Sequence, residues 1–385
     1  IDPETFLSVV DQETLRQIQV DDLFNAMNHT KTAAGAATLY RSLIRPLTSL
    51  ELIAAKQESL QELGSNDRLR NGLIDFFEEL KKGRLEIGWE KSLNGEEVLF
   101  DFLSQQDGDG LMYERFAEAR QTGVRLANAS QQIPRPETRY LKTLVDAVQN
   151  FDGTKNYRLV RGPIYYLRFT GGDLGSSEDI SLFTPRWKFV SGYDKFFTST
   201  KLAVVAASTV FLGIGTRYIP VNWLSQMLLL ASMGNVLVQM CFQVKKDSID
   251  WNKIIRPVQR SLWINKDFGL AIDSIGKLDE LVSFYEYGKA MPVPMTLPRV
   301  TESDQHYFRA RYISNPILAK DNPSYVLNDV GLDGCKLTFV TGPNSGGKTA
   351  LCKTIAQMQL MAQIGSYVPA TQAEMSVADR IFYQY

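Results

Sequence analysis

One stretch of nine residues constrains this chain more than any other: Thr341-Gly342-Pro343-Asn344-Ser345-Gly346-Gly347-Lys348-Thr349. It satisfies the pattern G-x-x-x-x-G-K-[ST], in which the backbone N–H groups of a glycine-rich loop surround phosphate groups. The run from Leu337 to Val340 is short and apolar and predicts a buried strand before the loop. Residues 350–364 lack Gly and Pro, repeat apolar residues at helical spacing and end before Gly365, which predicts a helix. Strand, loop and helix in this order predict a phosphate-binding loop, because a helix N-terminus favours negative charge.

The motif assigns a role to each residue of this loop. Lys348 is the catalytic candidate, because the lysine of the motif reaches the β- and γ-phosphates, and Thr349 is the candidate ligand of Mg²⁺. The predicted nucleotide-binding set is Gly342, Pro343, Asn344, Ser345, Gly346, Gly347, Lys348 and Thr349.

Composition limits the classes of protein that fit. The 385 residues include 44% hydrophobic and 22% charged residues, which is typical of a folded chain with two or three units. The formal net charge of -1 gives no overall basic excess of the kind that nucleic-acid-binding proteins carry. The three cysteines are far apart and the two histidines are isolated, so neither a disulfide framework nor a histidine metal site is expected, and a reducing compartment is the default.

The apolar pattern predicts a multi-domain α plus α/β protein. Residues 1–195 form the predicted helical region, in which Thr48-Ser49-Leu50-Glu51 predicts a capping box that opens a helix with Gly64 directly after its end. A second helix is expected over 67–82. Returning helices are predicted over 247–295, where Leu278, Leu281, Val282 and Tyr285 share an apolar stripe. Residues 296–385 are the predicted N-terminal part of a P-loop ATPase domain, with strands and turns leading into the loop.

A hydrophobic helical hairpin is predicted over 196–246. Trp223 to Val244 is a run of 22 residues without a charge, and as a helix it would be about 33 Å long, enough for a bilayer core of about 30 Å. Basic residues flank the hairpin, which by the positive-inside rule places both of its ends in the cytoplasm.

Two interpretations of this hairpin stay open. It could span a lipid bilayer through 196–244, which would put the protein on the cytoplasmic face of a membrane. It could instead be buried in protein, which would make the chain cytoplasmic. Amides in lipid are costly, which favours the buried alternative. The amides in or beside the run include Asn222, Gln226, Asn235 and Gln239.

Around the loop, the residues resemble the MutS family of DNA mismatch-repair ATPases. Gly342 to Thr349 is similar to that family's Walker A loop, which typically reads G-P-N-M-G-G-K-S/T, and the Pro-Asn pair is more specific than the general motif. The stretches 364–370 and 379–382 resemble the segment that follows the loop in the family. Ser324 to Val330 resembles the segment that lines its adenine pocket. Tyr325 falls where the family has an aromatic residue that stacks on the base, and tyrosine offers the flat π face that stacking needs.

The resemblance also includes helical segments, and in total it covers roughly 5–80 and 265–385. Leu15 to Leu47, which includes the stretches 20–24 and 28–35, resembles the helical core domain of MutS, and Leu278-Asp279-Glu280-Leu281 resembles its returning lever helix. What the resemblance implies is an ATP- and Mg²⁺-binding ABC-type ATPase that forms a homodimer through its ATPase domain and binds double-stranded DNA. The chain ends before an acidic Walker B strand or a signature loop, so we expect ATP binding without appreciable hydrolysis.

Three departures from the family pattern bear on function. The mismatch-reading N-terminal domain is missing from this sequence. The hydrophobic hairpin stands where MutS has its DNA clamp, which resembles the membrane-hairpin variants of the family. Asn315-Pro316 stands where the family commonly has His-Pro. An alternative function is therefore a membrane-anchored mechanochemical or scaffold ATPase with no role on DNA. A second alternative, a P-loop kinase for a small substrate, is disfavoured by the Pro-Asn loop and the helical N-terminal region.

Overall fold

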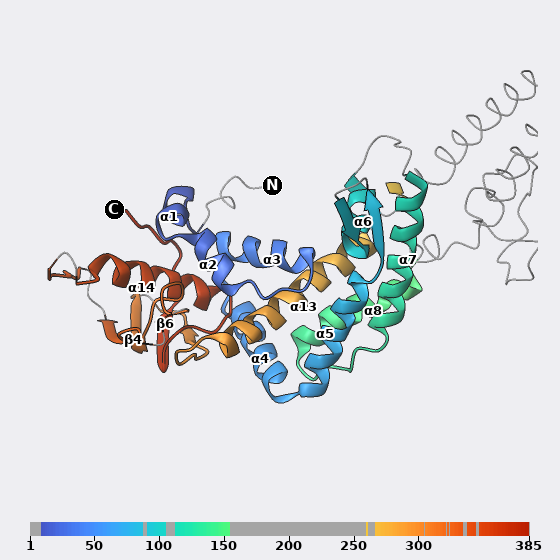
Figure 1. Ribbon diagram of the computed structural model, residues 1–385. Coiled ribbons are helices and arrows are strands. Elements are labelled where there is room, and N and C mark those ends of the chain that lie inside the picture. The colour runs from blue at the N-terminus through green and yellow to red at the C-terminus, as the bar shows by residue number, and fades with distance from the viewer. Residues whose placement is uncertain are drawn as a thin grey trace, which may run out of the picture. The chain divides into compact units, whose positions relative to one another are not determined.

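Figure 1 shows the computed structural model of the chain. The described residues are 9–87, 91–104, 112–154, 259–260, 266–303, 305–320, 322, 324–333, 337–343 and 346–384. The predicted hairpin over 196–246 lies outside them, as do Asn344 and Ser345 of the loop. The chain divides into two compact units, one of 1–82, 125–151 and 269–385, the other of 83–124 and 152–268.

Five helices open the first unit, as the sequence predicts for its N-terminal region. They are α1 (Gln12–Gln17), α2 (Val20–Met27), α3 (Ala33–Ile44), α4 (Leu50–Ser65) and α5 (Asp67–Lys81). Four of them begin at a side chain that accepts a hydrogen bond from the first turn, which satisfies an N–H group that the helix itself cannot. These capping residues are Asp11, Thr32, Ser49 and Asn66.

The predicted ends of α4 were each wrong by a short distance. Ser49, not Thr48, caps the helix, because its hydroxyl accepts from the backbone N–H of Leu52 at 3.4 Å. Gly64 lies inside the helix, which runs on to Ser65 because Asn66 can both end α4 and cap α5.

The helix α8 (Arg139–Gln149) belongs to the same unit and packs against α4. Thr138 does not cap it through its side chain. Instead the carboxylate of Glu62, on α4, accepts from the backbone N–H groups of Glu137 and Thr138 at 2.7 and 2.8 Å. This long-range acceptor fixes the backbone directly before the first turn of α8. A 3₁₀ turn at Asn150–Gly153 follows the helix.

The second unit contains a small sheet that the predicted all-helical region 1–195 did not include. Strands β1 (Arg84–Ile87) and β2 (Lys91–Asn94) pair antiparallel. Helix α6 (Gly95–Ser104) follows directly, and α7 (Met112–Ser130) comes next. Asn94 and Glu97 exchange hydrogen bonds between side chain and backbone at 2.9 Å, a reciprocal cap that starts α6 where the strand ends.

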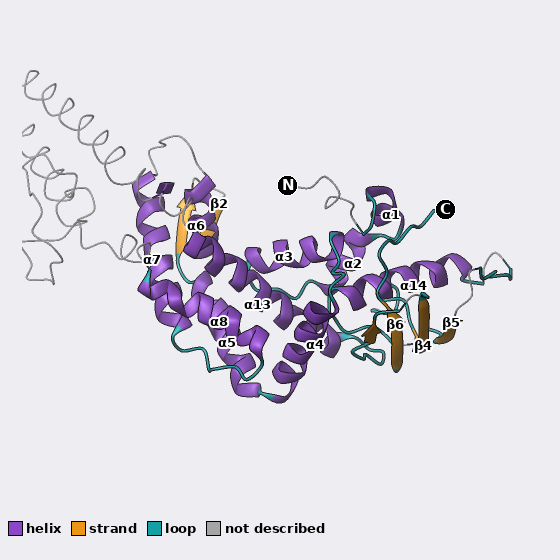
Figure 2. Cartoon of the chain, turned by 180° about the vertical axis from the view of Figure 1, so that it is seen from behind, coloured by secondary structure: helices purple, strands orange, loops and turns teal. Residues whose placement is uncertain are grey.

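The long helix α13 (Lys266–Ala290) supplies the centre of the first unit's core. The predicted stripe is confirmed at Leu278, Leu281 and Val282, which are fully buried, whereas its fourth member, Tyr285, is half-buried. Polar side chains of the same helix are buried as well, namely Asp279, Glu280 and Ser283. Figure 2 shows α13 running between α3 and α4. A helix that is buried on several faces needs partners for its polar groups, and here they come from segments that precede it by more than 200 residues.

Asp279 fastens α13 to the start of α3. Its carboxylate accepts from the backbone N–H of Lys31 at 2.9 Å and from the N–H and hydroxyl of Thr32 at 2.7 and 2.6 Å. Thr32 in turn accepts from the N–H of Gly35 at 2.9 Å. Burial raises the pKa of Asp279, and these hydrogen bonds act in the opposite direction. The carboxylate thus caps α3 together with Thr32.

Two further polar contacts hold α13 in place. Ser283 accepts from the backbone N–H of His29 and donates to the carbonyl of Met27, both at 2.9 Å. Glu280 pairs with Lys56 of α4 at 2.7 Å, and both side chains are almost fully buried. Removing one member of such a pair leaves the other charge buried without compensation, which makes the contact specific for this helix arrangement.

A four-stranded mixed sheet follows α13. Its strands are β3 (Arg299–Thr301), β4 (Tyr307–Ile313), β5 (Asn328–Asp333) and β6 (Gln372–Ser376), in the spatial order β3-β6-β4-β5. β3 and β6 are parallel, and β4 is antiparallel to both β5 and β6. Helix α14 (Lys348–Gln363) lies along this sheet in both ribbon views (Figures 1 and 2). The prediction of strands before the loop is confirmed by β4 and β5.

The predicted buried strand at Leu337–Val340 is not formed. These residues have no strand partner among the described residues, and Leu337 and Phe339 are 71% and 81% exposed. An apolar run becomes a strand only where a neighbour accepts its backbone hydrogen bonds. The described sheet ends at β5, so the segment gains no strand neighbour there and stays exposed to solvent.

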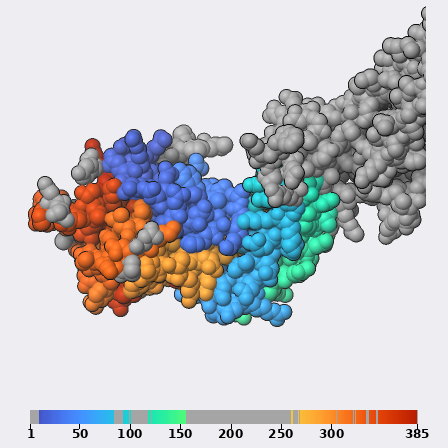
Figure 3. Space-filling view, viewed as in Figure 1, coloured from blue at the N-terminus to red at the C-terminus, as the bar shows by residue number. Residues whose placement is uncertain are grey.

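The N-terminal segment and the last described residues lie side by side. Val10 and Ile381 form a parallel bridge, and the N–H of Ile381 donates to the carbonyl of Val9 at 2.8 Å. Val10, Ile18, Leu360 and Ile381 form one buried cluster. Figure 3 shows the blue N-terminal helices against the red C-terminal segment.

Among the helices that the structure describes, none is long and apolar enough to cross a membrane.

We predict opposite stability effects for alanine at two helical glycines. A Cβ on Gly35 would lie 2.1 Å from the carboxylate of Asp279, whereas a Cβ on Gly269 in α13 would meet nothing within 4 Å. Gly35→Ala should lower the free energy of unfolding by about 1–3 kcal/mol, and Gly269→Ala should raise it by about 0.5–1 kcal/mol. Urea denaturation of both variants measures this. A Gly35→Ala protein as stable as the parent would contradict the packing described for Asp279.

Candidate nucleotide-binding site

The glycine loop leads directly into α14, as the motif predicts. Lys348 is the first residue of the helix, and Gly347 precedes it with a φ of 76°. Gly342 has a φ of 148°. At both glycines a Cβ would meet no atom within 4 Å, so the backbone conformation and not crowding calls for glycine. The described residues of the loop are exposed or nearly so.

Lys348 folds back over the loop. Its ammonium donates to the carbonyl oxygens of Gly342 and Pro343 at 2.7 and 2.6 Å. The N–H of Gly346 donates to the same carbonyl of Pro343 at 3.0 Å. The lysine charge is therefore held at the centre of the loop, where the motif places the β- and γ-phosphates. These contacts are exposed, and a phosphate oxygen can replace a neutral carbonyl as acceptor.

The start of α14 differs from the capped helices α1, α3, α4 and α5. Gly347 has no side chain, and no side chain of the described residues caps the helix. The N–H groups of the first turn thus have no side-chain acceptor, and they point along the positive end of the helix dipole. Thr349 is exposed in this turn. A triphosphate fits this donor set, since it offers acceptor oxygens and negative charge.

The other end of α14 is buried although it carries polar residues. Gln357 and Gln363 have no exposed surface. Gln357 donates to the carbonyl of Ile18 at 2.7 Å, and Gln363 donates to that of Leu47 at 2.9 Å. The N–H of Leu47 donates in return to the backbone carbonyl of Gln363 at 3.1 Å. These amides dock α14 on the segments that follow α1 and α3.

The predicted end of α14 is confirmed. Gly365 has a φ of 82°, its N–H donates to the carbonyl of Ala362, and the N–H of Ser366 donates to that of Met361, both at 3.0 Å. This pattern closes a helix and favours glycine at the left-handed position.

Tyr325 lies in the loop before β5 and is half-buried. Burial raises the pKa of its phenol, and a hydrogen bond from the backbone of Asn315 lowers it in part. Asn315 is buried and donates to Thr354 and Gln357 on α14. Asn315 thus joins the loop that contains the predicted base-stacking residue to α14. In the sequence this residue is only a departure from a family pattern. Its sequence signal is a polar residue followed by proline, which does not indicate burial.

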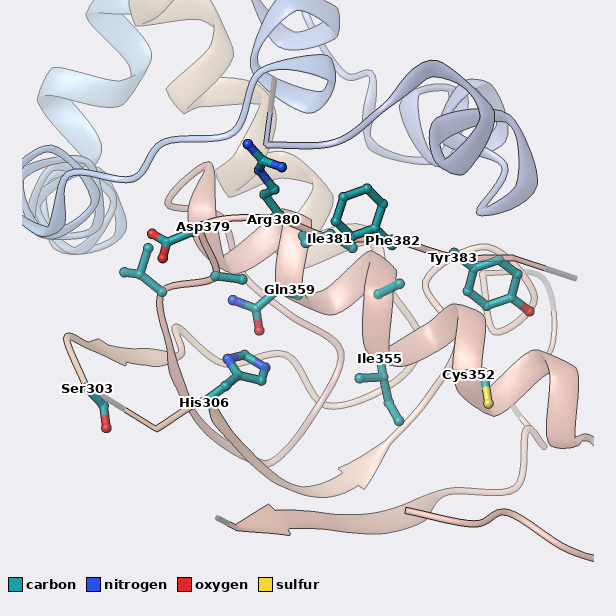
Figure 4. A pocket seen from close by; sticks show the side chains of 13 residues that line it. Ser303, His306, Cys352, Ile355, Gln359, Asp379, Arg380, Ile381, Phe382 and Tyr383 are labelled. Atoms are coloured by element: carbon teal, nitrogen blue, oxygen red, sulfur yellow. The ribbon is translucent and has the colours of Figure 1, made fainter. Parts of the chain in front are cut away.

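A pocket of about 520 Å³ opens beside the middle of α14, between that helix and the segment after β6 (Figure 4). No sequence pattern predicted this pocket. Its lining includes His306, Cys352, Gln359, Asp379 and Phe382. His306 contacts the hydroxyl of Ser376 through Nδ1 at 2.8 Å. The pocket contains no group of three or more His, Cys, Asp and Glu residues that could hold a metal, and no such group occurs elsewhere in the described part of the chain.

Both histidines of the chain have a pKa below the usual value. Burial lowers the pKa of His306. Burial is also the main cause at His29, where the charge of Lys320 adds to it. Neither histidine is therefore expected to carry a charge at neutral pH.

Comparison with known proteins finds matches to two domains. Residues 7–162 match the profile of MutS domain III, and residues 338–384 match that of MutS domain V. The first match extends the predicted resemblance, which stopped near residue 80. The sheet strands β1 and β2 and the helices α6 to α8 lie within the domain III match.

Individual relatives are DNA mismatch repair proteins. MutS of Thermosynechococcus vestitus is 24% identical over 411 residues, covering 99% of this chain and 45% of the relative. MSH2 of Zea mays is 39% identical over 111 residues, or 28% of this chain and 12% of the relative. MSH3 of Eremothecium gossypii is 47% identical over 70 residues, or 18% and 7%. The chain thus spans less than half the length of these relatives.

The histidines predict a pH dependence of stability. Because their pKa is lowered in the folded chain, the unfolded chain binds the proton more readily near pH 6.5, and stability falls as the pH drops through that value toward the folded pKa. Thermal unfolding from pH 7.5 to 5.5 should show this decline, and NMR titration should place both ring pKa values below about 6.5. A His29→Gln/His306→Gln double variant should lose most of the decline. Histidines titrating above 6.5 would contradict the burial described.

Proposed function

The chain is a MutS-family protein that carries MutS domains III and V, and from this premise we propose that it binds ATP·Mg²⁺ at the loop preceding α14. The observation that carries the proposal is the start of α14. There two glycines with positive φ, an N-terminus without a side-chain cap and the ammonium of Lys348 converge on one exposed loop.

The side chains have separate roles in this proposal. Lys348 exchanges its carbonyl contacts for the β- and γ-phosphate oxygens, and the N–H groups of the first helical turn bind the same anion. Thr349 is the residue that would hold Mg²⁺, which neutralises charge on the phosphates when it is bound. Tyr325 stacks on the adenine with the exposed part of its ring.

We predict that Lys348→Ala weakens ATP binding by about 1.5–3 kcal/mol, the range for charged hydrogen bonds, or roughly ten- to a hundredfold in Kd. Thr349→Ala should weaken binding only when Mg²⁺ is present. Isothermal titration calorimetry with and without Mg²⁺ measures both effects. The matched control is Lys353→Ala, since Lys353 lies on the same helix but donates to Gln19 at 3.1 Å. If Lys348→Ala and Lys353→Ala bind ATP as tightly as the parent, the site is elsewhere.

Dimer formation and DNA binding extend the proposal. The relatives that match are DNA mismatch repair proteins, and we propose that this chain belongs to an ATP-driven, DNA-binding homodimer that associates through its ATPase domain. A net charge of -1 means that any DNA contact must come from a local basic surface and not from the charge of the whole chain.

The charge-free run Trp223–Val244 favours a second candidate function, a membrane-anchored mechanochemical or scaffold ATPase. The run lies outside the described residues, and the candidate rests on its length and its basic flanks. It would place the ATP-binding loop on the cytoplasmic side of a membrane.

Fractionation and DNA binding together separate the two candidates. The membrane candidate predicts that the expressed chain stays in the pellet after a carbonate wash, dissolves in detergent and does not shift homoduplex or mismatched DNA. The DNA-binding candidate predicts a mobility shift that weakens steeply as salt rises, because counterions are released on binding. A carbonate-soluble chain would refute membrane insertion, and the absence of any shift at low salt would refute DNA binding.

A further inference from the structure

Asn315 links two parts of the proposed nucleotide site, the loop that carries Tyr325 and the helix that carries Lys348. We propose that it is a positioning residue that holds Tyr325 at a set distance from the phosphate-binding end of α14, and so determines how well the site distinguishes ATP from a bare triphosphate. This inference rests on the proposed ATP binding and deepens it. Its observations are the hydrogen bonds of a single buried amide.

The side chain of Asn315 is 4% exposed, and all of its hydrogen-bonding capacity is used. Oδ1 accepts from the backbone N–H groups of Ile317 and Leu318 at 3.0 and 2.9 Å. Nδ2 donates to Oγ1 of Thr354 at 2.9 Å and to Oε1 of Gln357 at 3.0 Å. One amide therefore joins the loop that follows β4 to two positions on α14.

Backbone groups determine the direction of each of these bonds. The N–H groups of Ile317 and Leu318 can only donate, so Oδ1 and not Nδ2 must face them. The opposite edge of the amide, Nδ2, then has only donors to offer to α14. Asn315 cannot be turned around without leaving two backbone N–H groups of the loop without their acceptor.

The partners on α14 are ready to accept. Thr354 donates its own proton to the carbonyl of Ala350 at 2.7 Å, which leaves Oγ1 as an acceptor. Gln357 turns its Nε2 to the carbonyl of Ile18 at 2.7 Å, which leaves Oε1 as an acceptor. The contact is thus a satisfied buried network, and such networks specify one arrangement of the elements that they join.

Backbone hydrogen bonds lead from Asn315 to the base-stacking residue. The carbonyl of Asn315 accepts from the N–H of Ala319 at 3.0 Å, and the carbonyl of Ala319 accepts from the N–H of Asn322 at 3.2 Å. The N–H of Tyr325 donates to the carbonyl of Asn322 at 3.1 Å. Asn315 therefore anchors the folded loop that carries Tyr325 and contacts α14 through its side chain.

The helix fixes the distance between this contact and Lys348. Thr354 lies six residues after Lys348, or about 9 Å along the helix axis at 1.5 Å per residue. Both Tyr325 and Lys348 are consequently positioned relative to α14. Lys348 is part of the helix, and the loop that carries Tyr325 is joined to the helix through Asn315. Without the donors of Asn315 the loop of residues 315–325 can shift against α14, while the glycine loop itself keeps its own contacts.

The experiment compares the affinity of the full 385-residue chain for ATP and for inorganic tripolyphosphate, each with Mg²⁺, by calorimetry. Asn315→Ala should weaken ATP binding roughly tenfold, which is the loss expected from about one well-placed contact. Its tripolyphosphate affinity should stay within about twofold of the parent, because the P-loop is untouched. The ratio of the two affinities is a readout that a loss of stability alone would not change.

Two further variants keep the test sharp. Thr354→Val is nearly isosteric and removes one acceptor of Nδ2, so it should weaken ATP binding in the same direction by a smaller factor, roughly threefold. Asn66→Ala makes the same truncation at the cap of α5, where Asn66 accepts from Leu69 at 3.0 Å, and should change neither affinity. Thr354→Val serves in place of Asn315→Ala if the latter does not fold.

Each outcome has a defined meaning. Selective loss of ATP affinity supports the positioning role of Asn315. Unchanged ATP affinity, or equal loss of ATP and tripolyphosphate, overturns it. If the parent chain binds tripolyphosphate and ATP equally well, Tyr325 makes no base contact and the inference fails while phosphate binding stands. If the parent binds neither ligand, the proposed function itself fails.

Discussion

The structure depends on a conflict within one helix: α14 must leave its first turn open for a ligand and still be buried along the rest of its length. Polar residues on the buried part resolve the conflict, because each amide meets a backbone carbonyl of another segment. Gln357 meets Ile18, Gln363 meets Leu47, and Gln359 meets Ser376 at 2.9 Å. Burying these amides without hydrogen-bond partners would cost more free energy than their packing contributes. The phosphate-binding loop is therefore attached to the helical region by hydrogen bonds that only one placement of α14 can satisfy.

The C-terminal end of α14 also contacts α4, which in turn pairs with the long helix α13. A Cβ on Gly365 would lie 2.8 Å from Cβ of Lys56, and Lys56 pairs with Glu280 of α13. Further along α13, a Cβ on Gly288 would lie 3.0 Å from the ring of Tyr367, in the segment that follows α14. α13 is in turn fastened to the start of α3 by Asp279. If ligand binding displaces α14, these packed and polar contacts can transmit the displacement to the helical region.

Local patterns determined what could be predicted. The loop, the helix that follows it and the glycine that ends that helix were predictable, because each is specified by neighbouring residues. The buried stripe of α13 was predictable from its apolar spacing. The roles of Asp279, Glu280 and Asn315 were not, because their partners lie between 39 and 248 residues away. Leu337–Val340 failed as a predicted strand for the same reason: a strand requires a neighbour, and spacing within the segment says nothing about one.

The most direct test of this account is hydrogen–deuterium exchange of the 385-residue chain with and without ATP·Mg²⁺. The account predicts slower exchange in peptides that contain the start of α14, since its N–H groups would bind phosphate. It also predicts slower exchange around Tyr325, whose loop Asn315 joins to α14, and around Ile18, whose carbonyl accepts from Gln357. Exchange that is unchanged by ATP at the start of α14 would contradict the central claim that this loop is the nucleotide site.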